Sequence, residues 1–160
     1  MKVKVSEKEA ALLAKQWIHL KDRADRMHAD HSTEYRKGIL GELAFAKAFG
    51  LAMDKRWRIT GDDGVDFVLR SGLNVDVKFS TKPSHLWVKE KLVGGPADVF
   101  VLTTSCGPDE VELVGWAKQA DLVDAEWRDT PFGGRCKILP AAKLRKMSDL
   151  VFLAAVDAHL

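Results

Sequence analysis

The fold of this chain is decided by the stretch VDFVLRSGLNVDVKFS, which spans residues 65–80. On both sides of Arg70-Ser71-Gly72, apolar residues alternate with polar ones, as they do in strands that bury one face. A three-residue loop with glycine at its third position is typical of a type I turn followed by a left-handed residue. The stretch therefore predicts an antiparallel hairpin in which residue 69 pairs with 73, 67 with 75 and 66 with 76.

The register of this hairpin determines where its charged side chains lie. When residue 67 pairs with 75, the apolar residues of both strands share one face and Asp66 lies beside Asp76. A two-residue turn at Ser71-Gly72 would pair 66 with 77 and put the two carboxylates on opposite faces. The hydrophobic pattern therefore predicts a cluster of Asp66 and Asp76, with Lys78 on the same face as Asp76.

A glutamate precedes the hairpin on a predicted helix that runs from residue 32 or 33 to Gly50, a favourable C-terminal cap. Glu42 falls in the apolar stripe of this helix, between Ile39 and Phe45. Burying a carboxylate alone is costly, so Glu42 must pair with a cation or bind a metal ion. Its position fits both interpretations, and the two aspartates of the hairpin favour the metal ligand.

The three acidic positions lie in short motifs: Gly41-Glu42-Leu43-Ala44, Gly64-Val65-Asp66-Phe67 and Asp76-Val77-Lys78. In this order, they resemble the active-site motifs of the PD-(D/E)XK nuclease superfamily, which includes restriction endonucleases, Holliday junction resolvases and small phage nucleases. The resemblance covers about residues 38–105, and Val65 stands where the family motif has a proline. Gly115-Trp116-Ala117 followed by Asp121-Leu122 also resembles the closing strand and helix of small phage-type members.

This resemblance implies an α/β fold with a restriction-endonuclease-like αβββαβ core, a mixed sheet flanked by helices on both sides. It also implies metal-dependent hydrolysis of DNA that leaves a 5′-phosphate and a 3′-hydroxyl. On this basis, Glu42, Asp66, Asp76 and the backbone carbonyl of Val77 would hold Mg²⁺, or Mn²⁺ as a substitute. Lys78 would orient the attacking water or stabilise the phosphate.

A candidate nucleic-acid contact follows the hairpin, in a strand predicted at residues 86–92. His85, Trp87, Lys89 and Lys91 alternate onto one face of this strand. Cations suit phosphates, and an indole suits a sugar or an unstacked base. An amphipathic edge strand protected by lysines explains the same pattern equally well.

The length and composition of the chain fit a single globular domain, with 160 residues that are 46% hydrophobic and 30% charged. We expect an N-terminal helix at residues 1–31, a catalytic core at 32–123 and a C-terminal extension at 124–160. Further strands are predicted at residues 57–59, 98–104, 112–117 and 136–139.

The formal net charge is only +2, but its distribution is uneven. Lys and Arg outnumber acids in residues 78–91 and 133–149, whereas acids dominate residues 108–129. This pattern fits a phosphate-binding side opposite an acidic side, and it fits a mosaic of solvated faces nearly as well.

No apolar run in the sequence reaches the length of a membrane span. Cys106 and Cys136 are expected to be buried free thiols, and the protein is expected to be cytoplasmic.

The expected function is an Mg²⁺-dependent DNA endonuclease that is structure-directed or weakly sequence-specific. A homodimer is expected if both strands of a duplex are cut. The alternative is a catalytically silent nucleic-acid-binding protein of the same fold. A third interpretation is a structural protein whose carboxylates pair with Arg36, Arg58 or Arg70.

Overall fold

Two β-sheets form the framework of the protein, which a computed structural model describes at residues 1–13, 32–53, 64–130 and 133–155. The larger sheet has the strand order β1-β6-β5-β3-β2, and the smaller has the order β4-β8-β7. The strands are β1 (Lys2–Lys4), β2 (Phe67–Val68), β3 (Asn74–Phe79), β4 (His85–Lys89), β5 (Val99–Gly107), β6 (Glu110–Lys118), β7 (Glu126–Asp129) and β8 (Arg135–Pro140). The α-helices are α2 (Ser32–Phe49) and α3 (Met147–Ala155), and short 3₁₀ helices lie at Glu90–Leu92, Gln119–Leu122 and Ala141–Lys143. Residues 7–13 are also helical.

The predicted hairpin is confirmed, with the register that the hydrophobic pattern indicates. Phe67 pairs with Val75, and Val68 pairs with Asn74. Gly72 has a φ of 83°, the left-handed conformation expected at the end of its turn. β3 then pairs in parallel with β5, and β5 pairs antiparallel with β6, so the larger sheet is mixed as predicted.

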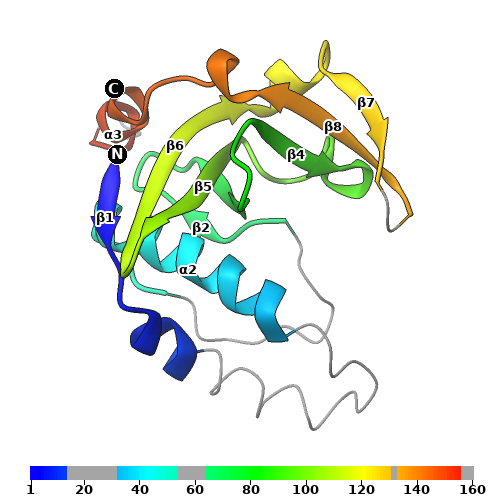
Figure 1. The fold of residues 1–160 in the computed structure, drawn as a ribbon. Coiled ribbons are helices and arrows are strands. Elements are labelled where there is room, and N and C mark those ends of the chain that lie inside the picture. The colour runs from blue at the N-terminus through cyan, green and yellow to red at the C-terminus, as the bar shows by residue number, and fades with distance from the viewer. Residues whose placement is uncertain (14–31, 54–63, 131–132, 156–160) are drawn as a thin grey trace, which may run out of the picture.

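The larger sheet is buried on both faces, because β5 sends alternate apolar side chains into two separate clusters. Val99 and Val101 join the first cluster, together with residues of α2 and α3. Phe100 and Leu102 join the second cluster, together with residues of β4 and β8. Figure 1 shows the same arrangement, with α2 on one side of β5 and β6 and the smaller sheet at the opposite side.

The expected helices on both faces of the sheet are not what the described residues show, since α2 and α3 both contribute to the first cluster. A second sheet covers the other face instead. The chain passes from β3 to β5 through β4 and the 3₁₀ helix Glu90–Leu92, with no α-helix in this crossover. The physical reason is the two-residue period of β4, which buries Leu86 and Val88 between the sheets and leaves their neighbours half-buried or exposed. The mixed α/β architecture is confirmed, and the restriction-endonuclease-like core stays a prediction.

Helix α2 ends as predicted and approaches the larger sheet closely. Gly50 has a φ of 63°, and the N–H of Leu51 donates to the carbonyl of Ala46 at 2.9 Å, which closes the last turn. On the buried side, a Cβ added to Gly41 would lie 2.4 Å from Thr103 Oγ1. Only a glycine therefore lets α2 lie this close to β3 and β5.

The segment expected as a C-terminal extension completes both clusters. β7 and β8 form two of the three strands of the smaller sheet. Met147 and Leu150 of α3 are buried in the first cluster. The strand predicted at residues 57–59 lies outside the described residues. None of the described helices is long and apolar enough to cross a lipid bilayer.

Candidate functional site

Asp76 and Lys78 form an ion pair on β3. The alternation of this strand puts Val75 and Val77 into the first apolar cluster, so Asp76 and Lys78 point to the other face. The Asp76 side chain is 1% exposed, the Lys78 side chain is 22% exposed, and Lys78 Nζ lies 2.6 Å from Asp76 Oδ1. A carboxylate that is buried to this extent needs a cation close by, and Lys78 supplies one.

Asp66 lies at the point where β2 and β3 separate. Its N–H donates to the carbonyl of Val75 at 2.8 Å, and its Oδ2 accepts the N–H of Val77 at 2.7 Å. The Asp66 side chain thus takes the place of a backbone carbonyl that a longer β2 would offer. In a strand, the N–H and C=O of one residue point to the same side, so the Val77 carbonyl is also directed toward this edge of β3. The fold therefore brings the Asp66 carboxylate to the main chain of the residue that follows Asp76.

Glu42 lies on the side of α2 that faces the protein interior, as the helical wheel predicts. Its side chain is half-buried, and its neighbours on the wheel, Ile39, Phe45 and Ala46, are buried. The preceding Gly41 is the point of closest approach to Val77 and Thr103. Among the described residues, no group of three or more His, Cys, Asp or Glu side chains is arranged to hold a metal ion. Glu42 as a third metal ligand therefore stays a prediction.

The oxygen atoms around Val77 nevertheless suit a magnesium ion. Mg²⁺ prefers hard oxygen ligands, is held in enzymes by one or two carboxylates, and keeps several waters. Asp66, Asp76 and the Val77 carbonyl offer two carboxylates and one carbonyl along a short length of β3. These groups are of the ligand type that Mg²⁺ takes.

The candidate nucleic-acid strand is confirmed as a strand with the predicted alternation. His85, Trp87 and Lys89 lie on one face of β4, and the intervening Leu86 and Val88 are fully buried. Lys91 lies beyond the end of the strand, in the 3₁₀ helix Glu90–Leu92. β4 forms an edge of the smaller sheet within the part of the chain that the structure describes.

Cations from the neighbouring strands accompany the aromatic side chains of the smaller sheet. The guanidinium of Arg128 lies 5.9 Å from the centre of the Trp87 ring. Arg135 and Lys137 each lie 4.8 Å from the centre of the Trp127 ring. Lys137 is 7% exposed and donates to the carbonyls of Val123 and Ala125 at 3.0 and 2.7 Å, so its ammonium holds the loop before β7. The sequence showed an excess of Lys and Arg in residues 133–149, which includes Arg135 and Lys137, but it did not predict their contacts with Trp127.

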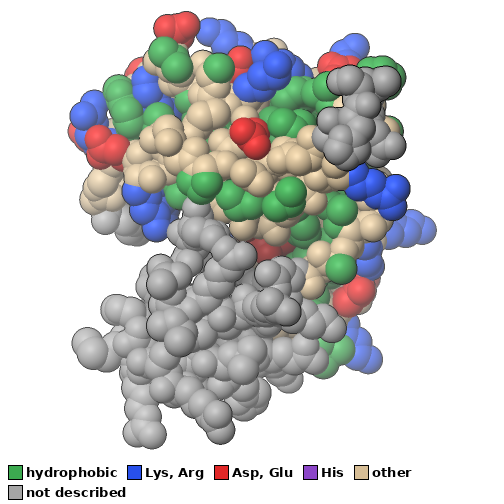
Figure 2. All heavy atoms as spheres, turned by 180° about the vertical axis from the view of Figure 1, so that it is seen from behind, with side chains coloured by type: hydrophobic (Ala, Val, Ile, Leu, Met, Phe, Trp, Pro, Cys, Tyr) green, Lys and Arg blue, Asp and Glu red, His purple; other side chains and the backbone are tan. Residues whose placement is uncertain are grey.

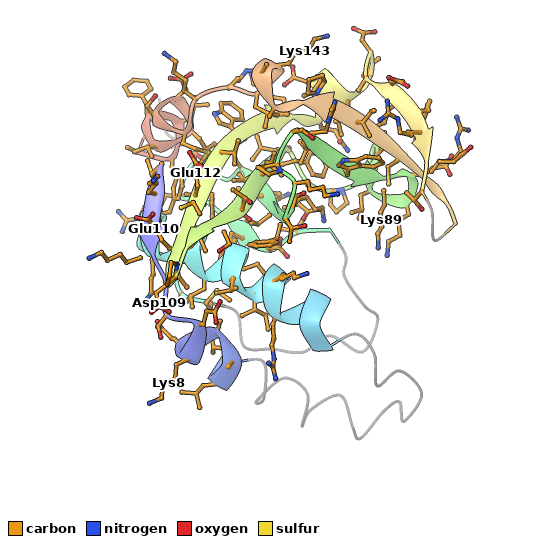
Figure 3. The ribbon with its side chains drawn as sticks, viewed as in Figure 1. Lys8, Lys89, Asp109, Glu110, Glu112 and Lys143 are labelled. Carbon is orange, nitrogen blue, oxygen red and sulfur yellow. The ribbon has the colours of Figure 1, made fainter. Side chains whose placement is uncertain are left out.

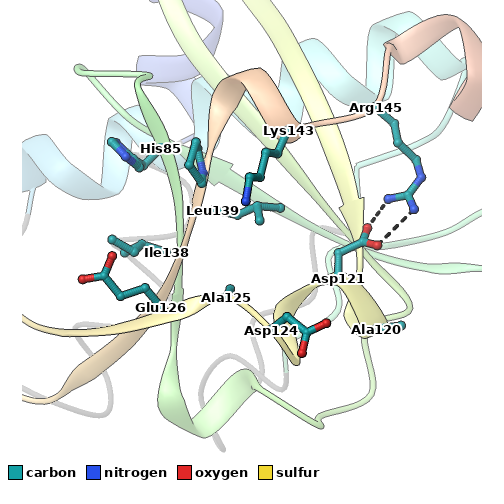
Figure 4. Close-up of a pocket in the computed structure, with 11 residues that line it drawn as sticks. His85, Ala120, Asp121, Asp124, Ala125, Glu126, Ile138, Leu139, Lys143 and Arg145 are labelled. Atoms are coloured by element: carbon teal, nitrogen blue, oxygen red, sulfur yellow. Dashed lines mark hydrogen bonds and ion pairs between the residues drawn. The ribbon is translucent and has the colours of Figure 1, made fainter.

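A pocket of about 640 Å³ lies at the end of the smaller sheet, and sequence reasoning did not identify it. His85 and Lys143 line it, with Ile138 and Leu139 as apolar walls (Figure 4). At its rim, Arg145 forms a bidentate ion pair with Asp121, one contact of which measures 3.0 Å. The hydrogen bond from Arg145 lowers the pKa of the Asp121 carboxyl, and the same contact raises the pKa of Arg145.

The acidic residues of the segment 108–129 do not form one side of the molecule, contrary to expectation. Asp109, Glu110 and Glu112 lie around the turn between β5 and β6, far from Lys89 on β4 (Figure 3). Asp121, Asp124 and Glu126 line the pocket at the smaller sheet. β6 separates the two groups because it spans nine residues. Figure 2 likewise shows acidic and basic side chains interspersed on the rear face of the molecule.

Both cysteines are free thiols as expected, but only Cys136 is buried. Burial raises the pKa of the Cys136 thiol. Cys106 is exposed, because it lies near the end of β5 where the strand has left the sheet interior.

The wider relationships of the chain add no assignment to this geometry. No protein-family model matches it, and no curated protein and no solved structure is detectably similar to it.

Proposed function

We propose that this protein is a metal-dependent DNA endonuclease of the PD-(D/E)XK type, with its active site at Asp66, Asp76 and Lys78. The observation that carries the proposal is the burial of the Asp76 carboxylate to 1% exposure, 2.6 Å from the more exposed Lys78 Nζ. A carboxylate and an ammonium held together at the edge of a sheet, beside a second carboxylate, are suited to phosphodiester hydrolysis.

Each residue of the site has a defined role in this proposal. Asp66 and Asp76 would hold Mg²⁺, or Mn²⁺, together with the Val77 carbonyl, and Glu42 would contribute directly or through a water. Such an ion would supply activation of a water ligand and neutralisation of charge on the phosphate. Lys78 holds the scissile phosphate or orients the attacking water. Asp66 keeps its orientation because its Oδ2 accepts the N–H of Val77.

DNA is the proposed substrate, and the face of β4 with His85, Trp87 and Lys89 is the proposed contact. Lys89 and Lys91 are exposed, so their ammonium groups are accessible to phosphates. Cleavage is structure-directed or weakly sequence-specific, and cutting both strands of a duplex takes two copies of the site in a homodimer.

The test is a nicking assay with supercoiled plasmid and with linear, flapped and four-way substrates, in the presence and absence of Mg²⁺. Wild type is expected to cleave at least one substrate only when the metal is present. Asp76→Asn is expected to lose cleavage and to retain the folded state by circular dichroism. Asp124→Asn is the matched control, because Asp124 is exposed and lies at the pocket of the smaller sheet. Full activity of Asp76→Asn would refute the site.

The second candidate is a catalytically silent protein in which the Asp76–Lys78 pair is structural, and the short contact of 2.6 Å favours it. Lys78 is the cation found beside Asp76, whereas the sequence suggested Arg36, Arg58 or Arg70 as partners, and Arg58 lies outside the described residues. A structural ion pair would bind Mg²⁺ poorly. Absence of cleavage of every DNA form, combined with absence of Mg²⁺ binding in calorimetry, would establish this alternative.

A further inference from the structure

We infer that Lys78 is a displaceable counter-ion of Asp76: it occupies the carboxylate in the metal-free protein and is released toward the substrate when a divalent cation binds. This inference rests on the proposed function and adds an order of events to it. Metal binding would precede, and would enable, the engagement of Lys78 with phosphate.

One contact of each carboxylate differs in the charge of the group that makes it. Asp66 Oδ2 accepts a neutral N–H from Val77 at 2.7 Å, a contact that persists beside a cation. Asp76 Oδ1 instead faces the Lys78 ammonium at 2.6 Å. A divalent cation bound to the Asp76 carboxylate would lie close to this ammonium, and two like charges at such a distance beside a buried group repel each other strongly.

The difference in burial indicates which partner moves. Asp76 is 1% exposed and is fixed on β3 between Val75 and Val77, both of which are in the first apolar cluster. Lys78 is 22% exposed, and its side chain is long and flexible. Lys78 therefore leaves and Asp76 stays. An ammonium displaced in this way would still be attached to β3 two residues from Asp76, close to a phosphate that binds the metal.

Two consequences distinguish displacement of Lys78 from Asp76 from the general electrostatic effect of any nearby lysine. The Asp76–Lys78 pair stabilises the metal-free protein, so removing Lys78 should lower the melting temperature only when the metal is absent. Removing it should also tighten metal binding, because Mg²⁺ then has no ammonium to displace. A distant lysine would change neither quantity appreciably.

The experiment measures Mg²⁺ and Mn²⁺ binding by calorimetry, without DNA, and thermal unfolding with and without each ion. The proteins are wild type, Lys78→Gln, Lys78→Arg and the control Lys82→Gln, whose side chain is exposed four residues along the chain. Lys78→Gln is expected to bind Mg²⁺ roughly tenfold more tightly than wild type, the low end of the coupling seen between close charges. Its melting temperature should fall without metal and recover with it. Lys78→Arg and Lys82→Gln should stay close to wild type.

The outcomes separate this inference from the proposed function. Equal or weaker Mg²⁺ binding by Lys78→Gln, with binding intact in wild type, overturns the inference and leaves the metal site standing. Absence of Mg²⁺ and Mn²⁺ binding in all four proteins overturns both. If Lys78→Gln does not fold, the inference is tested by NMR on wild type alone, by adding Mg²⁺ and following the signal of the Lys78 ammonium. That signal is expected to change. If it stays the same while the signal of the Asp76 carboxylate changes, the inference is overturned.

Discussion

The carboxylate of Asp66 accepts the backbone N–H of Val77 at 2.7 Å, at the place where β2 leaves β3. A side chain thus completes the hydrogen bonding of a sheet edge and is held against the strand that carries Asp76 and Lys78. The same contact gives Asp66 a structural role beside its proposed role in metal binding, and substitutions can separate the two.

Asp66→Ala is expected to lower the free energy of unfolding by about 1–3 kcal/mol, because the Val77 N–H loses its acceptor in a partly buried position. Asp66→Asn keeps an acceptor oxygen, so its loss of stability should be smaller, whereas its loss of Mg²⁺ binding should be as large. Urea denaturation and calorimetry measure the two effects. Equal stability of Asp66→Ala and wild type would show that the hydrogen bond carries no structural weight.

Gly41→Ala is expected to cost about 1–3 kcal/mol of stability, because its Cβ would lie 2.4 Å from Thr103 Oγ1 and 3.5 Å from Val77 Cγ1. Thr103 is fully buried and donates its hydroxyl to the carbonyl of Lys78 at 3.1 Å, so it has little room to yield. Thermal and chemical denaturation measure the change.

The matched control for this substitution lies one turn earlier on the same helix. A Cβ added to Gly38 has no neighbour within 4 Å, so Gly38→Ala should stabilise α2 by up to about 1 kcal/mol. The double variant Gly41→Ala/Thr103→Ala should recover part of the loss. A Gly41→Ala protein as stable as Gly38→Ala would mean that α2 does not contact β5 at Thr103.

Asp121 and Arg145 predict a pH-dependent contribution to stability. Arg145 lowers the pKa of Asp121 in the folded protein. The contribution is therefore present above the unfolded-state pKa of about 3.9 and is lost as the pH falls through the lower, folded value. Because the side chains are 26% and 36% exposed, its size should be only about 0.5–1 kcal/mol. The unfolding free energies of wild type and Asp121→Asn should differ by this amount at neutral pH and converge in acid. A difference that grows in acid would contradict the pairing.

Lys89→Ala is expected to reduce the salt dependence of DNA binding if the outer face of β4 contacts phosphates. Loss of one phosphate contact should lower the slope of log K against log salt by about 0.9 for duplex DNA. Lys8→Ala is the control, because Lys8 is exposed and lies far from Lys89 in the structure (Figure 3). Fluorescence anisotropy across a salt series measures both slopes. The same slope in Lys89→Ala and wild type would remove β4 from the proposed interface.

Local chemistry was sufficient for the elements that surround the candidate site. The two-residue period of residues 65–69 and 73–79, with Gly72 between them, predicted the pairing of Phe67 with Val75. The apolar stripe of α2 and its end at Gly50 were predicted for a similar reason, since neighbouring residues determine both features. The inward position of Glu42 follows from the same stripe.

The contacts within the site and around it depended on tertiary structure. Alternation places Asp76 and Lys78 on one face, but the burial of Asp76 to 1% exposure and its pairing with Lys78 at 2.6 Å arise only in the folded protein. The sequence predicts β4 as a strand, yet its partner β8 comes from the far end of the chain, and the two strands cover the face of the larger sheet where helices were expected. The ion pair between Asp121 and Arg145 also depends on tertiary structure, because the two residues lie 24 positions apart in the sequence. The close approach of Gly41 to Thr103 depends on it for the same reason. Hydrophobic period and turn chemistry act between neighbours, so the sequence by itself determined the elements and their faces. Which faces meet is determined by the burial of apolar surface between distant segments, and that was decided only in the folded protein.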